Sequence, residues 1–327
     1  MEQQYTNYYH FHGLRLAVAT HDPCLRAALH ARLRLCVAPP DNPAQLHFNF
    51  HRVATLAEAG LPQPRGRIRL IYEPPRIGGE MLYAEEEDRL YLRWGEYISG
   101  ICNPRQNHTQ IFYESSAHDR LWLISHATFM SALIELLKRR GYYSLHAAGL
   151  CLNGRGLLLP GASGSGKTTL AIALARAGFG FLGDDMMFLR PASEGLQIRA
   201  FPDEIDVTAK TVQLFPELAE LLEPSPGSGR VKRQLRPEAV TKDLVAACRP
   251  GVLVFPQVAT AAASTLKPMG RDEALLELAS NVLLTESRAS QAHLDALAEL
   301  VRQSDCYRLE TGQNLEALAV QLAHLVS

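Results

Sequence analysis

The feature that most constrains this chain is the run Gly161-Ala-Ser-Gly-Ser-Gly-Lys-Thr168, which matches the pattern G-x-x-x-x-G-K-[ST] in full. The apolar run Gly156-Leu-Leu-Leu-Pro160 precedes it and predicts a buried strand. The residues from Thr168 to Ala177 are good helix formers, and Gly178 follows them as a stop. A strand, this loop and a helix in that order form the context in which the pattern binds phosphate groups.

Each residue type in the loop has a physical role. Glycine accepts left-handed backbone angles, so the N–H groups of residues 163 to 168 can point inward at an anion. The positive end of the helix dipole adds to this attraction. We expect Lys167 to reach the β- and γ-phosphates of ATP and the Thr168 hydroxyl to bind Mg²⁺. The predicted nucleotide-binding residues are Gly161, Ala162, Ser163, Gly164, Ser165, Gly166, Lys167, Thr168 and Thr169.

Two adjacent carboxylates follow the predicted helix. The segment from Phe179 to Asp185 predicts a strand that ends in Asp184 and Asp185. Asp184 lies 17 positions after Lys167, which allows one helix and a return strand beside the first. One carboxylate is expected to hold the metal and the other to accept a proton from an attacking hydroxyl. We assign Asp184 as the base, and Asp185 together with Thr168 as the metal ligands. The residues leave the opposite order open. The alternative for the pair is a solvated Asp-Asp turn that closes the strand and has no catalytic role.

The histidine, the loop and the carboxylate pair together resemble a known family. His146 before the loop strand, the loop at 161–168 and Asp184-Asp185 are similar, in kind and in spacing, to the catalytic core of HPr kinase/phosphorylase and its wider superfamily. The resemblance covers roughly residues 142 to 325. It is weaker through Ala200-Phe-Pro202, the basic run near Lys232, Leu253-Val-Phe-Pro256 and Cys306-Tyr-Arg-Leu-Glu310.

The resemblance implies an ATP-dependent, Mg²⁺-requiring kinase that transfers the γ-phosphate to a hydroxyl, most simply a serine of a partner protein or peptide, or a small molecule. It also implies that His146 lies close to the transferring phosphate; a packed core histidine is the alternative. A basic run after a Pro/Gly/Ser-rich stretch places Arg230 and Lys232 where they could close over ATP and neutralise charge on the γ-phosphate. A solvated basic loop is the other interpretation of this run.

Two departures separate the chain from authentic HPr kinases. Thr168-Thr169 stands where the family has serine-glutamate, and the glutamate-isoleucine-arginine-glycine run tied to the reverse reaction is not found. We therefore expect an acceptor other than HPr. An ATP-binding switch or scaffold and a carboxykinase-like phosphotransfer enzyme remain as alternatives. HPr kinases form ring-shaped oligomers, so a homo-oligomer is one expectation from the resemblance.

Composition excludes several other classes. The 327 residues carry a formal net charge of -1, which argues against a nucleic-acid or membrane-surface binder. No apolar stretch approaches the length of a membrane span, and the polar, aromatic N-terminus is unlike a secretory signal. The six cysteines are scattered without a C-x-x-C pair, which favours reduced thiols and a cytoplasmic location.

The predicted fold class is α/β, a P-loop kinase core of the HPr kinase C-terminal type at 142–327 behind a smaller, mostly β domain at 1–116. Alternating stretches predict strands at 46–53, 67–72 and 89–94, and a stretch from residue 8 to residue 20 ends in another. Apolar spacing predicts one helix over 117–141 that bridges the domains. Leu145 to Leu152 is predicted as one strand, with His146 in its first positions.

Overall fold

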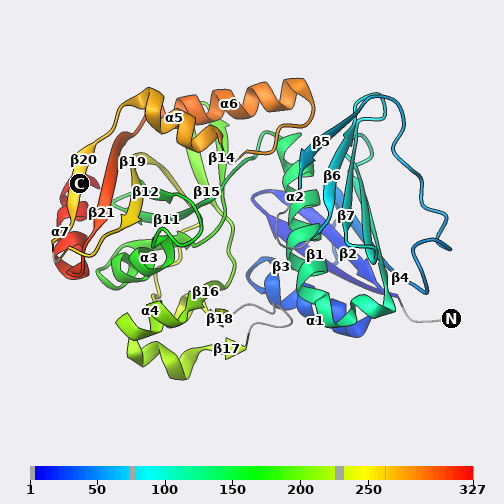
Figure 1. The fold of residues 1–327 in the computed structure, drawn as a ribbon, viewed down its shortest axis with the longest axis horizontal. Helices are drawn as coiled ribbons and strands as arrows, with labels where there is room; N and C mark the ends of the chain where they lie inside the picture. Colours follow the sequence, from blue (N-terminus) through cyan, green and yellow to red (C-terminus); the bar gives the residue numbers. More distant parts are fainter. Residues whose placement is uncertain (1–3, 74–77, 225–231, 262, 281, 327) are drawn as a thin grey trace. The chain divides into compact units, whose positions relative to one another are not determined.

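The computed structural model describes residues 4–73, 78–224, 232–261, 263–280 and 282–326. The chain is a mixed α/β protein, as the sequence predicts, and it divides into two compact units (Figure 1). Unit 1 contains Met1–Arg140 and Leu283–Ser290, and unit 2 contains Gly141–Ser225, Arg230–Val282 and Gln291–Ser327.

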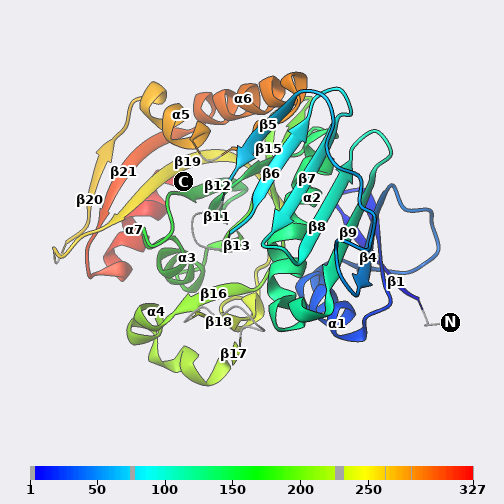
Figure 2. The same ribbon diagram turned by 45° about the vertical axis from the view of Figure 1, so that its right-hand side comes forward.

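Unit 1 is built on a sheet whose strands run in the order β3-β1-β2-β4-β9-β8-β7-β6-β5 (Figure 2). The strands are β1 (Tyr5–Phe11), β2 (Leu14–Thr20), β3 (Val37–Ala38), β4 (Leu46–Val53), β5 (Ile68–Tyr72), β6 (Glu80–Ala84), β7 (Arg89–Trp94), β8 (Ile98–Asn103) and β9 (His108–Glu114). The predicted strand at 46–53 is confirmed to the residue, and the stretch 8–20 is a hairpin. The chain reverses there because His12 and Gly13 adopt positive φ angles of 45° and 89°.

One face of this sheet is covered by helices and holds the core of unit 1. Alternation along β4 turns Leu46, Phe48 and Phe50 to this face, where all three are buried. The helices are α1 (Pro23–Arg32), which Asp22 caps at its N-terminus, and α2 (Phe129–Lys138). The Phe129 ring packs edge-on against Phe48 with centroids 4.9 Å apart.

The region predicted as a single helix over 117–141 contains three successive segments of different helix type. A 3-10 segment, Ser115–Arg120, precedes a π-helical segment, Leu123–Thr128, and only α2 is an α-helix. The Thr128 hydroxyl donates to the Leu123 carbonyl five residues earlier at 2.9 Å, which satisfies an acceptor in the wider turn. The apolar spacing predicted the buried stripe but could not distinguish these helix types. α2 belongs to unit 1.

The C-terminal end of α2 carries a buried charged network. Glu135, Lys138 and Thr285 are each 2% exposed. The Lys138 ammonium donates to Glu135 Oε2 at 2.9 Å, to Thr285 Oγ1 at 2.6 Å and to the Leu283 carbonyl at 3.0 Å. Burial lowers the pKa of Lys138, and the Glu135 charge opposes that shift. These bonds attach the segment that precedes α6 to α2 within unit 1.

Unit 2 contains a second sheet in the order β10-β14-β15-β19-β12-β11-β13, and β21 pairs with both β19 and β20. Its strands are β10 (Tyr143–Leu145), β11 (Ala147–Leu152), β12 (Arg155–Pro160), β13 (Gly180–Gly183), β14 (Met187–Ala192), β15 (Gly195–Ala200), β19 (Ala247–Val258), β20 (Thr265–Pro268) and β21 (Asp305–Thr311). Its helices are α3 (Lys167–Arg176), α4 (Ala209–Leu214), α5 (Arg271–Ala279), α6 (Ser287–Arg302) and α7 (Leu315–Val326). A small sheet joins β16 (Ile205–Thr208), β18 (Lys232–Leu235) and β17 (Glu223–Pro224).

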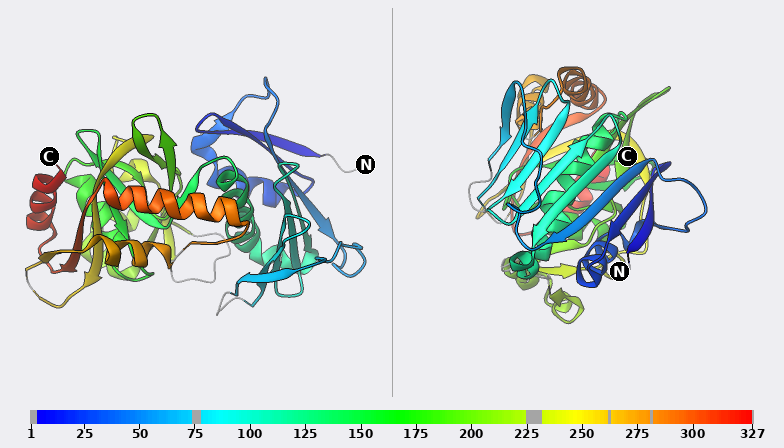
Figure 3. Two further views of the ribbon diagram at one scale, coloured as in Figure 1. Left: turned by 90° about the horizontal axis from the view of Figure 1, so that it is seen from above. Right: turned by 90° about the vertical axis from the view of Figure 1, so that its right-hand side faces the viewer.

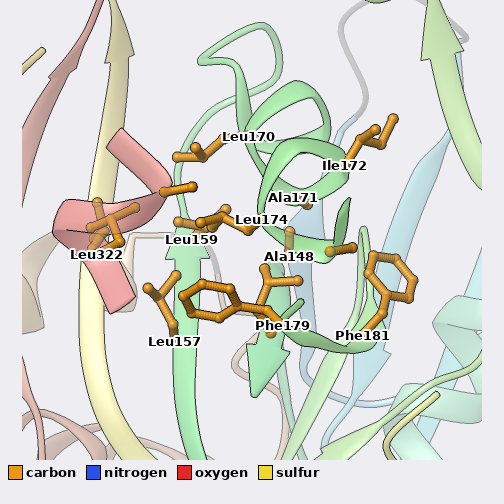
Figure 4. Packing of buried hydrophobic residues seen from close by; sticks show 14 of the residues in the cluster. Ala148, Leu157, Leu159, Leu170, Ala171, Ile172, Leu174, Phe179, Phe181 and Leu322 are labelled. Atoms are coloured by element: carbon orange, nitrogen blue, oxygen red, sulfur yellow. The ribbon is translucent and has the colours of Figure 1, made fainter. Parts of the chain in front are cut away.

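Helices pack on both faces of the unit 2 sheet. On one face Leu170 and Leu174 of α3 and Leu322 of α7 pack against Leu157 and Leu159 of β12 (Figure 4). On the other face α5 and α6 lie beside each other (Figure 3) and bury an apolar cluster against the strands. This arrangement makes β12 and β19 central strands that are buried on both sides, which explains their continuous apolar runs.

Within the described ranges, no helix combines the length and the apolar composition that crossing a membrane requires. The six cysteines are free thiols, and Cys24 alone among them is exposed.

Replacing Lys138 by methionine is expected to destabilise unit 1 by about 3 kcal/mol, because it leaves part of a buried ion pair uncompensated. The chain has two tryptophans, Trp94 and Trp122, and both lie in unit 1, so tryptophan fluorescence during urea unfolding reports on this unit. Arg67→Met breaks the solvent-exposed pair Arg67–Glu85 of the same unit and serves as the control, with a loss below about 1 kcal/mol. Equal losses in the two variants would contradict this account of the network.

Candidate functional site

The loop at 161–166 joins the carboxyl end of β12 to the first residue of α3. Gly161, Gly164 and Gly166 have φ angles of 153°, 88° and 96°, so the loop follows a path that other residues adopt only with strain. α3 begins at Lys167, and its first N–H groups have no partner within the helix. A strand, a glycine-rich turn and a helix N-terminus therefore form one continuous segment, as the sequence predicts.

Lys167 lies folded across the loop that precedes it. Its side chain is largely buried, and its ammonium group donates to the Gly161 carbonyl at 2.6 Å and to the Ala162 carbonyl at 3.0 Å. These bonds hold the positive charge over the mouth of the loop. The same amine would meet an anion that lies on the loop N–H groups.

Asp184 follows β13, but β13 does not lie beside β12. β11 lies between them and is antiparallel to both, so the expectation of a return strand next to the loop strand is wrong. The connection from β12 through α3 to β13 passes over one intervening strand, and that strand is β11. Because β11 runs in the opposite direction, its first residue lies at the same sheet edge as the carboxyl ends of β12 and β13.

This topology explains the position of His146. The strand predicted over 145–152 is interrupted at His146, which separates β10 from β11. β10 pairs with β14, whereas β11 pairs with β12 and β13. His146 therefore lies at the point where the chain changes neighbours, at the edge of the sheet that also carries the loop and Asp184.

Asp184 is a buried carboxyl with one hydrogen bond from the loop helix. The Thr168 hydroxyl donates to Asp184 Oδ2 at 2.9 Å. Asp184 Oδ1 is buried and has no hydrogen-bond partner among the described residues. Burial, followed by repulsion from Asp185, raises the pKa of Asp184 to about 7, while the Thr168 hydrogen bond opposes the shift. An orphaned carboxyl oxygen beside a threonine hydroxyl is a suitable pair of oxygen ligands for a hard cation.

Asp185 has the opposite environment, although it is the next residue. Its side chain is 68% exposed, and its Oδ1 lies 3.2 Å from His146 Nδ1. His146 Nδ1 also lies 3.0 Å from the Asp185 carbonyl oxygen. Both partners are acceptors, so Nδ1 carries the proton and the imidazole donates to Asp185. The pair thus separates into one buried carboxyl and one exposed carboxylate that a histidine orients.

Thr169 is joined to a part of the site that the sequence motifs did not predict. Its hydroxyl lies 2.9 Å from the Thr211 hydroxyl, which lies 3.2 Å from the hydroxyl of Thr208. Thr208 ends β16 and caps α4. Asp206 of β16 is close enough to Asp184 to raise its pKa further. Residues 205–208 alternate between buried and half-buried positions, as in a strand with one face in the core, but such alternation does not say which neighbour the strand meets.

Arg230 lies outside the described residues, so its predicted role is not tested. Lys232 is the first residue of β18, opposite Thr208 of β16, and only its backbone position is described. Two other cations of the basic run are engaged locally. Arg233 donates to the Leu222 carbonyl at 2.7 Å, and Arg236 pairs with Glu223 at 2.8 Å.

Comparison with solved structures aligns this chain with the Hpr(Ser) kinase/phosphatase from Coxiella burnetii. The alignment has 12% sequence identity and a TM-score of 0.30, and it covers 56% of this chain and 93% of that chain. No protein-family model matches the sequence, and no curated protein matches it. A likeness this distant carries no functional argument.

In metal-free protein, raising the pH should destabilise the wild type relative to Asp184→Asn. Burial raises the pKa of Asp184 from its ordinary value of 3.8 in the unfolded chain to about 7 in the folded protein. Its contribution to stability is therefore full below about pH 4 and is lost as the pH rises through 7, by up to about 4 kcal/mol. Urea unfolding in EDTA at pH 5 to 8.5 measures the difference. Asp272→Asn, at an exposed carboxylate on α5, is the control, and parallel curves for all three proteins would contradict the assignment.

Proposed function

We propose that the chain is an ATP-dependent kinase that transfers the γ-phosphate to a hydroxyl group of an acceptor molecule. The observation that carries the proposal is the hydrogen bond from Thr168 to Asp184. It joins the first turn of a helix behind a G-x-x-x-x-G-K-T loop to a buried carboxyl with a free oxygen. A nucleotide-binding loop needs a hydroxyl and a carboxylate at this place to hold the metal of a metal-nucleotide complex.

The loop would bind the phosphate chain through its backbone N–H groups. Lys167 would exchange its bonds to the Gly161 and Ala162 carbonyls for bonds to phosphate oxygens. This exchange keeps the amine hydrogen-bonded before and after binding, so the charge is never left unpaired in a largely buried position. Residues 161 to 169 are the proposed nucleotide-binding segment.

The residues present fit Mg²⁺ together with a nucleotide. Thr168 Oγ1 and Asp184 Oδ1 are the oxygens that would hold it, which reverses the assignment made from the sequence. Among the residues that the structure describes, no group of three His, Cys, Asp or Glu side chains is arranged to hold a metal. Mg²⁺ does not need one, because it keeps several waters and binds substrate phosphates. When bound, it supplies positive charge that neutralises the phosphates and favours ionised Asp184.

Asp185 is the proposed general base. It is the exposed member of the pair, so an acceptor hydroxyl can reach it, and His146 fixes its orientation through Nδ1. The acceptor oxygen would attack the γ-phosphorus while its proton passes to the Asp185 carboxylate, and ADP would leave with the electrons of the broken P–O bond. The predicted roles of Arg230 and Lys232, as cations that approach the γ-phosphate, remain part of this proposal.

The proposal assigns the catalytic function to the predicted domain at 142–327 and leaves the acceptor open between a serine of a protein or peptide and a small molecule. A homo-oligomer is likewise proposed only from the resemblance noted in the sequence.

Transfer of label from γ-labelled ATP into a lysate of the source cell tests the function. Lys167→Ala should lose both ATP binding and labelling, because it removes the charge that meets the phosphates. Asp185→Asn should bind ATP normally but label the acceptor about 100-fold more slowly, since it removes the base. Asp184→Asn should need more Mg²⁺ for half-maximal labelling, and Asp272→Asn is the matched control.

Calorimetry of ATP binding by the same variants separates the alternatives. Tight ATP binding by the wild type with no labelled species at any Mg²⁺ concentration would overturn the kinase and favour a switch or scaffold. Equal labelling by Asp185→Asn and the wild type would overturn the base assignment alone.

A further inference from the structure

The carboxyl end of β19 lies on the side of the loop away from the carboxylates. In the sheet, β12 is flanked by β19 on one side and β11 on the other, and β13 lies beyond β11. On the β11 side, His146 directly precedes β11, and Asp184 and Asp185 directly follow β13. β19 is parallel to β12, with Leu158 beside Leu253, so both strands deliver their carboxyl ends to the same edge. The loop therefore lies between the carboxylates and the end of β19.

Val258 is the last residue of β19 and lies against the loop. A β-carbon placed on Gly166 would come within 3.3 Å of Val258 Cγ2, and one placed on Gly161 within 3.9 Å of the Pro256 ring. Even so, Val258 is 69% exposed. A β-branched apolar side chain thus presents most of its surface to solvent while it lies in the space beside Gly166, the residue that precedes α3.

A nucleoside triphosphate has the γ-phosphate at one end and the nucleoside at the other. The site has the carboxylates on one side of the loop and the end of β19 on the other. Reaction at the γ-phosphate requires that end to lie beside the carboxylates. The phosphate chain then crosses the helix N-terminus, and the nucleoside leaves the loop on the opposite side. A nucleobase is a flat aromatic ring. Covering its faces with an apolar side chain removes them from water, which lowers the free energy of the complex.

We propose that the carboxyl end of β19 is the nucleoside subsite, with Val258 packing against the base of the bound nucleotide. The inference rests on the proposed function, because it assumes that the loop holds the phosphates. Beyond that function, the inference gives the direction in which the nucleotide lies across the loop. It also names a contact residue that no loop motif predicts. Val258 contacts the base only, so it contributes to affinity for the nucleoside and not to affinity for the phosphates.

Inorganic tripolyphosphate separates the two contributions, since it has the phosphate chain and lacks the nucleoside. Val258→Ala should weaken ATP binding by roughly 3-fold to 10-fold, which corresponds to one or two methyl groups removed from an apolar contact. Its affinity for tripolyphosphate should stay within about 2-fold of wild type, since the phosphate contacts are unchanged. Calorimetry with each ligand and Mg²⁺ gives both values. Val320→Ala is the matched control, because Val320 is 61% exposed on α7 of the same unit.

The outcomes distinguish this inference from the proposed function. If the wild type binds neither ATP nor tripolyphosphate, the proposed function fails and the subsite fails with it. If the wild type binds both and Val258→Ala binds ATP as tightly as the wild type does, the loop assignment stands and the subsite is overturned. Equal weakening of ATP and tripolyphosphate would also overturn it, because the variant would then have disturbed the loop. Unchanged thermal unfolding of Val258→Ala checks that the fold is intact.

Discussion

The candidate site depends on how one carboxyl group, that of Asp184, is held in a place that water does not reach. Removing a carboxylate from water is costly, and the neighbouring Asp185 and Asp206 add repulsion, so Asp184 favours its protonated form. The Thr168 hydroxyl offsets part of that cost at one oxygen and leaves the other without a partner. The proposed metal site uses this oxygen together with the Thr168 hydroxyl. Burial thus gives Asp184 an environment opposite to that of its exposed neighbour Asp185.

The antiparallel strand β11 brings the remaining parts of the site together. In a sheet of parallel strands alone, a residue before a strand would lie at the opposite edge from the loop. Because β11 runs against β12 and β13, its preceding residue, His146, returns to the edge where the loop and the carboxylates lie. The imidazole then donates to Asp185 through Nδ1. A single reversed strand therefore decides that the histidine and the carboxylate are neighbours.

The buried charged groups of unit 1 differ from Asp184 in their hydrogen bonding. Its sheet has one helix-covered face filled by aromatic and aliphatic side chains, and its buried charges compensate each other. Glu135 bonds Lys138, Arg139 and Thr285, so its carboxylate is saturated with donors, in contrast to Asp184. A saturated buried carboxylate stabilises one arrangement of the chain, whereas an unsaturated one favours a ligand. Within one chain, the same residue chemistry thus supports structure in one unit and a candidate site in the other.

The sequence by itself determined what is local. The loop motif with its flanking strand and helix, the alternation of β4 and the mixed α/β class all follow from spacing within a few residues, because backbone angles and side-chain faces repeat over that range. Only the tertiary structure decided which strand lies beside which. It placed β11 between β12 and β13, interrupted a predicted strand at His146 and gave Asp184 and Asp185 opposite exposures. It also set Thr211 beside Thr169 of α3 and Val258 beside the loop. These features arise from pairings between segments far apart in the chain, and a pattern of neighbouring residues contains no information about such partners.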